Sequence, residues 1–331
     1  NSSKLYELSA QRKFVNEENY TRDPYYDKIE ELKKSLFELT CYKKVSIIID
    51  DLDEYDEKIA TNTSFAKFLS KFIEVSYKLN LDLNKVSPGS KIILLFRSDL
   101  FRFLHNDSTN LNKYVVNSQV NLNWLKDSNT SQPEKHILID MIFNKIRTSI
   151  PKWYEKTNLE LYEMLFPAKI KGRETLKYLL NYSHGRPRDI VNLLNKIIYK
   201  YPDASKFTNE MFLAVEPEYS ADFCNELRNE ISLYYGSDYI NACFSMLTLI
   251  RKNNFWKSEA EKIIFQNQQL AIITNLDEAL EMLYRYGAIG NMKAITPKDI
   301  KFYFGYREDG SETLNYGEKF TVHFALRKAL L

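Results

Sequence analysis

Two adjacent carboxylates, Asp50 and Asp51, directly follow an apolar, β-branched run at residues 45–49. A run without polar alternation predicts a strand buried on both faces, as in the centre of a parallel sheet. Open α/β sheets bind ligands beyond the carboxyl ends of their strands. At that position one carboxylate suits Mg²⁺, which prefers hard oxygen ligands, and the next can deprotonate an attacking water. The alternative is a solvated strand end that leads into an acidic loop.

A second predicted buried strand, residues 91–96, ends at Arg97. If the two strands are adjacent, the Arg97 guanidinium points at the same crevice and can bind a terminal phosphate. The alternative is an ordinary strand-end arginine paired with Asp99 or with the acidic loop.

Arg186 and Arg188 lie where a helix is predicted to begin, in the sequence His-Gly-Arg-Pro-Arg-Asp at residues 184–189. Positive side chains are unfavourable near a helix N-terminus, so another interaction must favour them there. A bound phosphate is one such interaction. Pairing with Asp189 or a neighbouring acid is the other.

The elements around these residues predict an α/β sheet in the first part of the chain. Helical spacing of apolar residues predicts helices over 27–39 and 65–77, and alternation predicts a third strand over 114–122. From about residue 133 the pattern becomes helical, with no strand between the predicted helices. These helices cover 137–150, 175–183 and 190–201.

The last part of the chain predicts helices followed by a β-hairpin. The helices cover 221–234, 238–252, 255–265 and 277–286. Two alternating runs, 300–306 and 320–324, then bracket an Asp-Gly turn, which is typical of a hairpin with a long connection. Three helices followed by a hairpin is the order of a winged-helix module. Its acidic and basic residues are nearly balanced, which favours a protein partner or an intramolecular role over DNA.

Composition excludes several classes of protein. The 331 residues include 46 Lys and Arg against 44 Asp and Glu, so the net charge of +2 implies no strong polyanion partner. No apolar run is long enough for a membrane span, and three widely spaced cysteines indicate a reducing compartment, so we expect a cytoplasmic protein. Only nine glycines occur, none in the first 88 residues, so no phosphate-cradling loop or dinucleotide-binding turn is present.

These motifs together resemble the STAND/AAA+ group of P-loop ATPases over about residues 40–331. The run IIIDDLDE resembles its Walker B motif, LLFRSD its sensor 1 strand and HGRPRD its lid motif. The resemblance implies part of a P-loop NTPase-type parallel sheet in residues 1–130. A helical lid in 131–218 and a winged-helix domain in 219–331 would follow.

By this resemblance the protein is an ATP- and Mg²⁺-dependent switch that couples nucleotide state to lid movement and assembly. Asp50 would coordinate Mg²⁺ through water and Asp51 would activate the attacking water. Arg97 would sense the γ-phosphate, and Arg186 or Arg188 would couple nucleotide state to the lid. Members of the group often act in bacterial stress response or antiviral defence, through self-association or a protein partner.

The missing Walker A loop leaves two interpretations open. Either the N-terminal part of an ATPase core precedes Asn1, or the protein has lost nucleotide chemistry. In the second case it is an inactive scaffold whose winged helix binds a protein partner or DNA.

Overall fold

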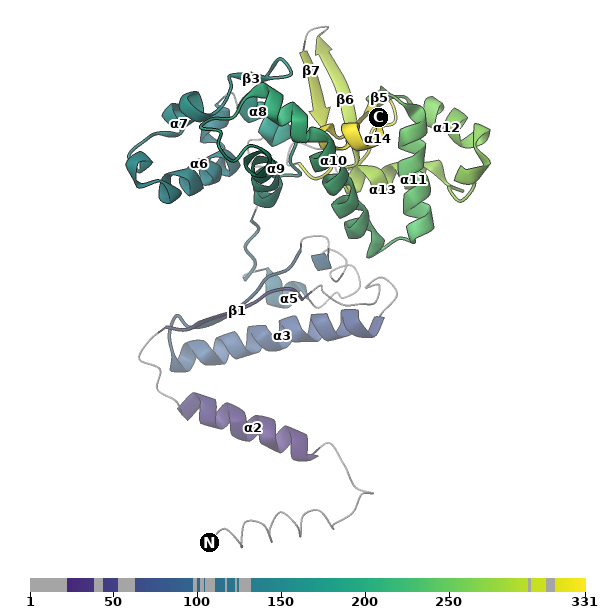
Figure 1. The fold of residues 1–331 in the computed structure, drawn as a ribbon. Helices are drawn as coiled ribbons and strands as arrows, with labels where there is room; N and C mark the ends of the chain where they lie inside the picture. Colours follow the sequence, from purple (N-terminus) through teal and green to yellow (C-terminus); the bar gives the residue numbers. More distant parts are fainter. Residues whose placement is uncertain are drawn as a thin grey trace, which may run out of the picture. The chain divides into compact units, whose positions relative to one another are not determined.

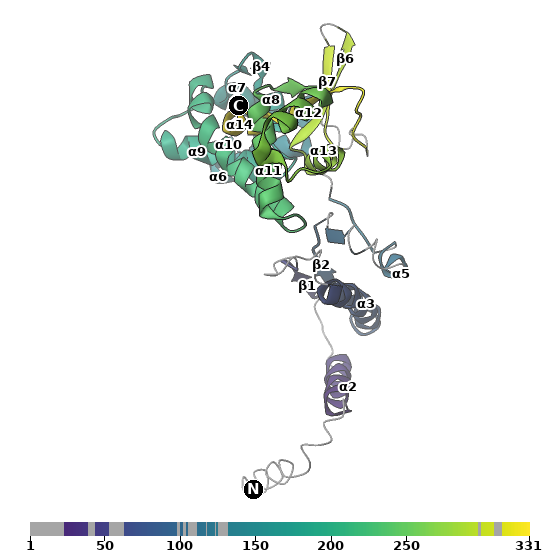
Figure 2. The same ribbon diagram turned by 90° about the vertical axis from the view of Figure 1, so that its right-hand side faces the viewer.

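The computed structural model divides the chain into two compact units, Asn1–Gln119 and Val120–Leu331 (Figures 1 and 2). We call them the N-terminal unit and the C-terminal unit. The boundary predicted between residues 130 and 131 lies outside the described residues. The structure describes residues 23–38, 44–52, 63–97, 100–101, 104, 111–116, 118–122, 124, 132–296, 299–307 and 313–331.

The N-terminal unit contains two long helices and a short parallel pair of strands, which confirms both predicted helices and the first two predicted strands. Helix α3 is longer than predicted because its apolar spacing continues past residue 77. The elements in chain order are α2 (Asp23–Glu38), β1 (Ser46–Ile49), α3 (Thr63–Val86), β2 (Lys91–Leu94) and α5 (Asn112–Val115).

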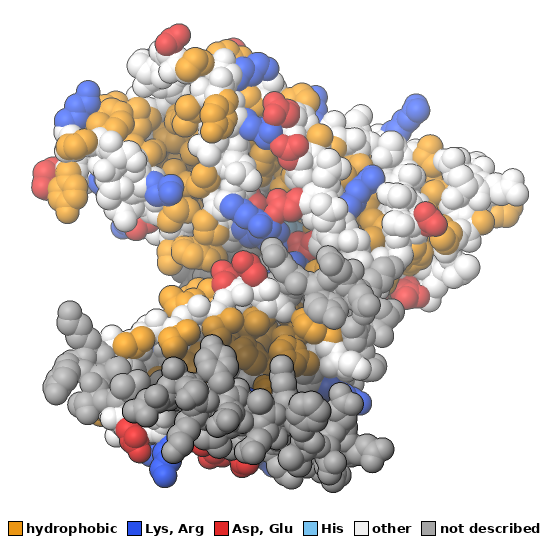
Figure 3. Space-filling model, turned by 60° about the horizontal axis from the view of Figure 1, so that its bottom comes forward, with side chains coloured by type: hydrophobic (Ala, Val, Ile, Leu, Met, Phe, Trp, Pro, Cys, Tyr) orange, Lys and Arg blue, Asp and Glu red, His pale blue; other side chains and the backbone are white. Residues whose placement is uncertain are grey.

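Strands β1 and β2 pair in parallel, with Ser46 opposite Lys91 and Ile49 opposite Leu94. The parallel pair is as predicted, but the described residues show these two strands and no larger P-loop sheet. The prediction that β1 is buried on both faces is wrong, because Ile48 is 62% exposed and Ile47 is also exposed. The reason is that no described element covers those isoleucines, although their β-branched side chains still favour a strand. Figure 3 shows hydrophobic side chains exposed on this unit.

Helix α3 packs against β2 and also occupies part of that strand's outer edge. The Ile92 N–H donates to Asn80 Oδ1 over 2.6 Å, and Asn80 Nδ2 donates to the Ile92 carbonyl over 2.8 Å. The Asn80 amide therefore takes the place of a neighbouring strand at this position. The small core beneath is made of Ala66, Leu69, Ile73, Leu100, Leu104, Leu111 and Val115.

The third predicted strand, over 114–122, is wrong. Tyr114 and Val115 belong to helix α5, and residues 118–122 form no strand. The alternating residues Val116, Val120 and Leu122 are all exposed. An alternation of apolar and polar residues stabilises a strand only when the apolar face is buried, and here the apolar side chains are exposed.

The C-terminal unit is mixed α/β and mostly helical, with a small sheet near its end (Figure 1). Its larger helices are α6 (Ile137–Ser149), α7 (Asn158–Leu165), α8 (Thr175–Asn181), α9 (Pro187–Lys200), α10 (Asn209–Ser232), α11 (Ser237–Ile250), α12 (Lys257–Gln266) and α13 (Leu276–Arg285). Its strands are β3 (Lys169–Ile170), β4 (Arg173–Glu174), β5 (Asn254–Phe255), β6 (Ile289–Thr296), β7 (Asp299–Tyr303) and β8 (Lys319–Val322). Its short helical turns are η1 (Pro133–Lys135), η2 (Pro151–Trp153), η3 (Gln268–Leu270), η4 (Phe324–Leu326) and α14 (Arg327–Leu330).

The helical region differs from the prediction in three places. Helix α7 was not predicted. Strands β3 and β4 form a two-residue antiparallel hairpin between α7 and α8, where no strand was expected. A glycine in positive φ at its turn is the only local signal for it. Helix α10 begins well before residue 221, and the boundary predicted between residues 218 and 219 falls inside it.

The predicted hairpin between 300–306 and 320–324 is wrong in its pairing. The sheet order is β5-β8-β6-β7, so β7 and β8 each pair antiparallel with β6 and not with each other. Strand β6 was not predicted, and it contains Gly290, a residue type that is depleted in strands. The Asp309-Gly310 turn itself lies outside the described residues. The order of three helices followed by strands, α11 to α13 and then β6, is as expected.

One continuous core runs through the C-terminal unit. It joins the faces of α6, α9, α10 and α11 to the inner face of the sheet, where Phe320 and Val322 are fully buried. Among the described helices, none is both long enough and apolar enough to cross a bilayer.

Candidate functional site

The paired strands bring two of the predicted motifs to one edge of the N-terminal unit. Asp50 directly follows β1, and Arg97 comes three residues after the end of β2. Because the strands are parallel and in register, both residues lie beyond the same, carboxyl end of the sheet. The Leu95 N–H still donates to the Ile49 carbonyl over 2.9 Å, so the ladder extends to the residue before Asp50.

The backbone turns sharply between the two carboxylates. Asp51 has φ of 57°, in the left-handed region that is uncommon for a residue with a side chain. The Asp50 carboxylate accepts the Asp51 N–H over 2.9 Å and holds this turn. Strained residues of this kind are often found at functional sites, where the surrounding structure offsets their cost.

Both carboxylates are exposed, and Arg97 is half-buried. Exposed carboxylate oxygens suit Mg²⁺, which keeps several of its waters and takes one or two ligands from the protein. In the part of the chain that the structure describes, no group of three or more His, Cys, Asp or Glu side chains could hold a metal ion. Among the described residues, Asp50 and Asp51 would therefore need water or phosphate oxygens to complete the coordination of Mg²⁺. The acidic residues that follow, from Asp53, lie outside the described residues.

The predicted lid motif opens helix α9 in the C-terminal unit. Gly185 has φ of 74°, and Pro187 is the first residue of the helix, so Arg186 lies at the N-cap. Asp189 is buried in the first turn, where its carboxylate accepts the His184 N–H over 2.7 Å. Burial raises the pKa of Asp189 to about 6, because a low-dielectric environment disfavours its charged form.

Both arginines of this motif pair with carboxylates of helix α10. The Arg186 guanidinium lies 2.6 Å from a carboxylate oxygen of Glu230 and 3.8 Å from one of Glu226. Arg188 pairs with Glu226. The neighbouring acids that we considered as the alternative to a phosphate are therefore present, and they come from α10. The role of these arginines in binding phosphate stays a prediction.

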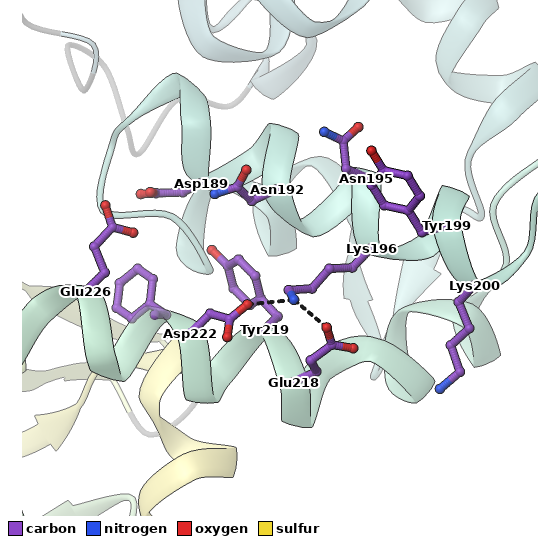
Figure 4. Close-up of a pocket in the computed structure, with 11 residues that line it drawn as sticks. Asp189, Asn192, Asn195, Lys196, Tyr199, Lys200, Glu218, Tyr219, Asp222 and Glu226 are labelled. Atoms are coloured by element: carbon purple, nitrogen blue, oxygen red, sulfur yellow. Dashed lines mark hydrogen bonds and ion pairs between the residues drawn. The ribbon is translucent and has the colours of Figure 1, made fainter.

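Helices α9 and α10 enclose a polar groove next to this motif (Figure 4). Its volume is about 610 Å³. Lys196 of α9 lies 2.6 Å from a carboxylate oxygen of Glu218 and 2.6 Å from one of Asp222, both on α10. These residues were not predicted from the sequence, although a basic helix face followed by an acidic one is a recognisable signal. Acidic side chains outnumber lysines in its lining, so the groove shows no preference for an anion.

Two buried histidines join the lid motif to the final sheet. The rings of His184 and His323 have centroids 5.5 Å apart, and Tyr306 contacts both. His323 Nδ1 accepts the Ala325 N–H, so the neutral ring carries its proton on Nε2 and donates it to the Tyr306 hydroxyl over 2.8 Å. Burial lowers the pKa of both histidines well below its ordinary value. No sequence signal links them, since they are far apart in the chain.

Comparison with known proteins gives one match, to part of the C-terminal unit. No curated protein and no solved structure matches the chain. A family model described as a FunZ-associated C-terminal helical domain matches residues 136–228. The matched segment runs from the start of α6 into α10, and so includes the His-Gly-Arg-Pro-Arg-Asp motif and the carboxylate of Glu226. Residues 136–228 are thus similar to the FunZ-associated C-terminal helical domain, and this domain is helical here as its description says.

Proposed function

We propose that this chain carries the Walker B and sensor 1 strands of a nucleotide-dependent switch of the STAND/AAA+ type. The observation that carries the proposal is the parallel, in-register pairing of β1 and β2, which brings Asp50 and Arg97 to the same end of the sheet. The strained backbone at Asp51 supports it. The exposed isoleucines of β1 fit a sheet that further elements of an ATPase core cover.

In this proposal each residue has a separate task. The Asp50 carboxylate holds Mg²⁺ through water, and the ion offsets the charge of the ATP phosphates. Asp51 accepts a proton from the attacking water. Arg97 donates hydrogen bonds to the terminal phosphate, for which its planar, always charged guanidinium is suited.

The C-terminal unit would transmit the nucleotide state. We assign α6 to α9 to a lid and α11 to β8 to a winged helix, whose helices and strands follow the expected order. Arg186 and Arg188 couple the lid to nucleotide by exchanging their α10 partners for phosphate. The match to a FunZ-associated domain fits a defence-associated, ATPase-like protein. In this proposal the protein acts in the cytoplasm, by self-association or through a protein partner.

The test is ATP hydrolysis by the protein expressed at the full length of its gene. Asp50→Asn and Arg97→Ala should each lower turnover by about 10²–10⁴-fold, the usual contribution of one acid–base or charge-stabilising group. Asp82→Asn is the matched control, because Asp82 is an acid on the surface of α3 that pairs with Lys85. Unchanged turnover in Asp50→Asn and Arg97→Ala would disprove the proposal.

A second function, an inactive scaffold, is favoured by two specific observations. Arg186 and Arg188 already have carboxylate partners, and the Asn80 amide occupies the edge of β2 that another strand would need. A scaffold predicts no Mg·ATP binding by the full-length protein and unchanged partner binding in Asp50→Asn. A salt-sensitive mobility shift with duplex DNA would identify DNA rather than protein as the partner, since phosphate contacts weaken steeply with salt.

A further inference from the structure

A cavity of about 400 Å³ in the C-terminal unit is lined by four positively charged side chains. Lys171 and Arg173 come from the β3–β4 hairpin, and Arg327 and Lys328 come from α14 near the end of the chain. The two pairs are far apart in sequence, so only the fold brings them together. Like charges repel, and such a cluster needs a compensating interaction.

The backbone holds both pairs in place. Lys171 and Gly172 form the hairpin turn with φ of 50° and 76°, the conformation of a type I′ turn, which favours glycine at its second position. Ser220 of α10 fixes the other pair, because its hydroxyl donates to the Ala325 carbonyl and accepts the Ala329 N–H. The cationic side chains therefore extend from two anchored segments of backbone.

One side-chain carboxylate, that of Glu216, lines this cavity, and it already has partners within the protein. A Glu216 oxygen lies 2.6 Å from Lys171 Nζ, and the Tyr182 hydroxyl donates to the same carboxylate over 2.7 Å. Arg173, Arg327 and Lys328 have no carboxylate partner among the residues that the structure describes. The cavity thus has three positive charges that no described carboxylate neutralises.

The unneutralised charges lie close together. The guanidinium carbons of Arg173 and Arg327 are 4.7 Å and 4.3 Å from the centre of the Phe324 ring. Burial, and then the charge of Arg173, lower the pKa of Arg327 to about 10. This pKa still leaves Arg327 charged at neutral pH, at an electrostatic cost that a bound anion would remove.

A buried donor adds an independent indication of a ligand. Tyr178 is 1% exposed and lines the cavity. Within the described part of the chain its hydroxyl lies near that of Tyr182 but makes no hydrogen bond of good geometry. Buried hydroxyls normally have partners, since an unpaired one costs about 1–3 kcal/mol. A ligand with several acceptor oxygens would satisfy it.

We propose that this cavity binds the phosphate or polyphosphate group of a small phosphorylated molecule. A ligand with a single carboxylate would neutralise only one of the three uncompensated cations. A phosphate carries up to two negative charges, and its several oxygens can accept hydrogen bonds from the guanidinium and hydroxyl donors. The site uses none of Asp50, Asp51, Arg97, Arg186 and Arg188, so it is separate from the proposed nucleotide switch.

The test is calorimetric titration of the full chain with pyrophosphate in the absence of divalent metal. The chain should bind pyrophosphate, and Arg173→Glu and Lys328→Glu should each weaken binding by about ten- to a hundredfold, as expected for loss of a charge-assisted contact. Lys169→Glu is the matched control: it makes the same charge change on the same hairpin, but Lys169 does not line the cavity. Tyr178→Phe keeps the ring and should weaken binding several-fold.

Three further results separate this proposal from its alternatives. Asp50→Asn should bind pyrophosphate as the unmodified chain does, so failure of the ATPase proposal leaves this result intact. Equal weakening by Lys169→Glu, or no binding at millimolar pyrophosphate, would overturn the site. Binding of duplex DNA without binding of pyrophosphate would overturn it as well, because the anion would then be a nucleic-acid backbone rather than a small molecule.

Discussion

Strands β1 and β8 have the same length, four residues, but opposite environments. In β8 of the C-terminal unit Phe320 and Val322 are fully buried, whereas in β1 of the N-terminal unit Ile48 is 62% exposed. Burial of apolar surface is the main stabilising contribution in folding, about 25 cal/mol per Å². The C-terminal unit therefore stabilises its own sheet, and the N-terminal unit has apolar strand surface still available to cover.

The two units also differ in how far helix faces are buried. Phe244 of α11 is fully buried, but Phe68 of α3 is 57% exposed, although it stacks on Phe65 and Phe72 along its own helix. Exposed apolar residues in contiguous rows usually mark an interaction surface. This contrast is what the proposed function predicts, because further elements of an ATPase core would cover the N-terminal unit.

The largest expected effect is on the core of the C-terminal unit. Phe244→Ala should lower the free energy of unfolding by about 3–5 kcal/mol, because it removes a fully buried ring and leaves a cavity. Phe68→Ala, the same change in the N-terminal unit, should cost about 1 kcal/mol, the contribution of its ring contacts. Urea unfolding of both variants measures the difference. Equal losses would contradict the proposed contrast between the units.

Acid should destabilise the C-terminal unit. Burial keeps His184 and His323 neutral in the fold, so below pH of about 6.5 the unfolded chain takes up protons that the fold does not, and stability falls. The slope is at most about 1.4 kcal/mol per pH unit for each histidine. Asp189 opposes it in part, because its pKa of about 6 adds stability at acid pH that is lost as pH rises through that value.

The measurement is the free energy of unfolding at pH 7.5 and at pH 5.5, with fluorescence of the C-terminal unit as the probe of unfolding. His323→Gln should reduce the loss between these two conditions by about half, since one of two neutral histidines is removed. Asp189→Asn should steepen the loss instead. An unchanged pH dependence in His323→Gln would show that His323 is not responsible.

The ion pairs between α9 and α10 should differ in how much they contribute to the free energy of unfolding. Arg186→Ala should cost about 1–2 kcal/mol, less than for a fully buried pair, because its side chain is 30% exposed and that of Glu230 is 14% exposed. Arg188 is 60% exposed, so Arg188→Ala should cost at most about 1 kcal/mol. A double-mutant cycle with Glu230→Gln isolates the pair. Additive losses in Arg186→Ala and Glu230→Gln would mean that the contact does not stabilise the fold.

The smallest effect is expected in β1. Ile48→Ala should change the stability of this chain by no more than about 0.5 kcal/mol, because little of its side chain is buried. Leu69→Ala in the same unit is the control and should cost about 2–5 kcal/mol, since Leu69 is fully buried. A large loss in Ile48→Ala would show that the strand is covered in solution, for example by a second molecule.

Local sequence patterns predicted most of the helices and the first two strands. The spacing of apolar residues reports which face of a helix is buried, and this worked for α2, α3, α6 and α8 to α13 with shifts at their ends, but not for α7, which was not predicted. The same reasoning failed for the strand over 114–122 and for the pairing of β7, because alternation shows that a segment suits a sheet but not which partner it has.

Three features were readable in the sequence alone: the carboxylates after a β-branched strand, the arginine after the next strand, and the lack of a glycine-rich phosphate-binding motif in these 331 residues. These are local properties of residue type and order. The tertiary structure decided that β1 is exposed, that Arg186 and Arg188 face Glu226 and Glu230, and that Arg173 meets Arg327 over one aromatic ring. Burial and charge compensation depend on which distant segments meet, and only the folded chain fixes those neighbours.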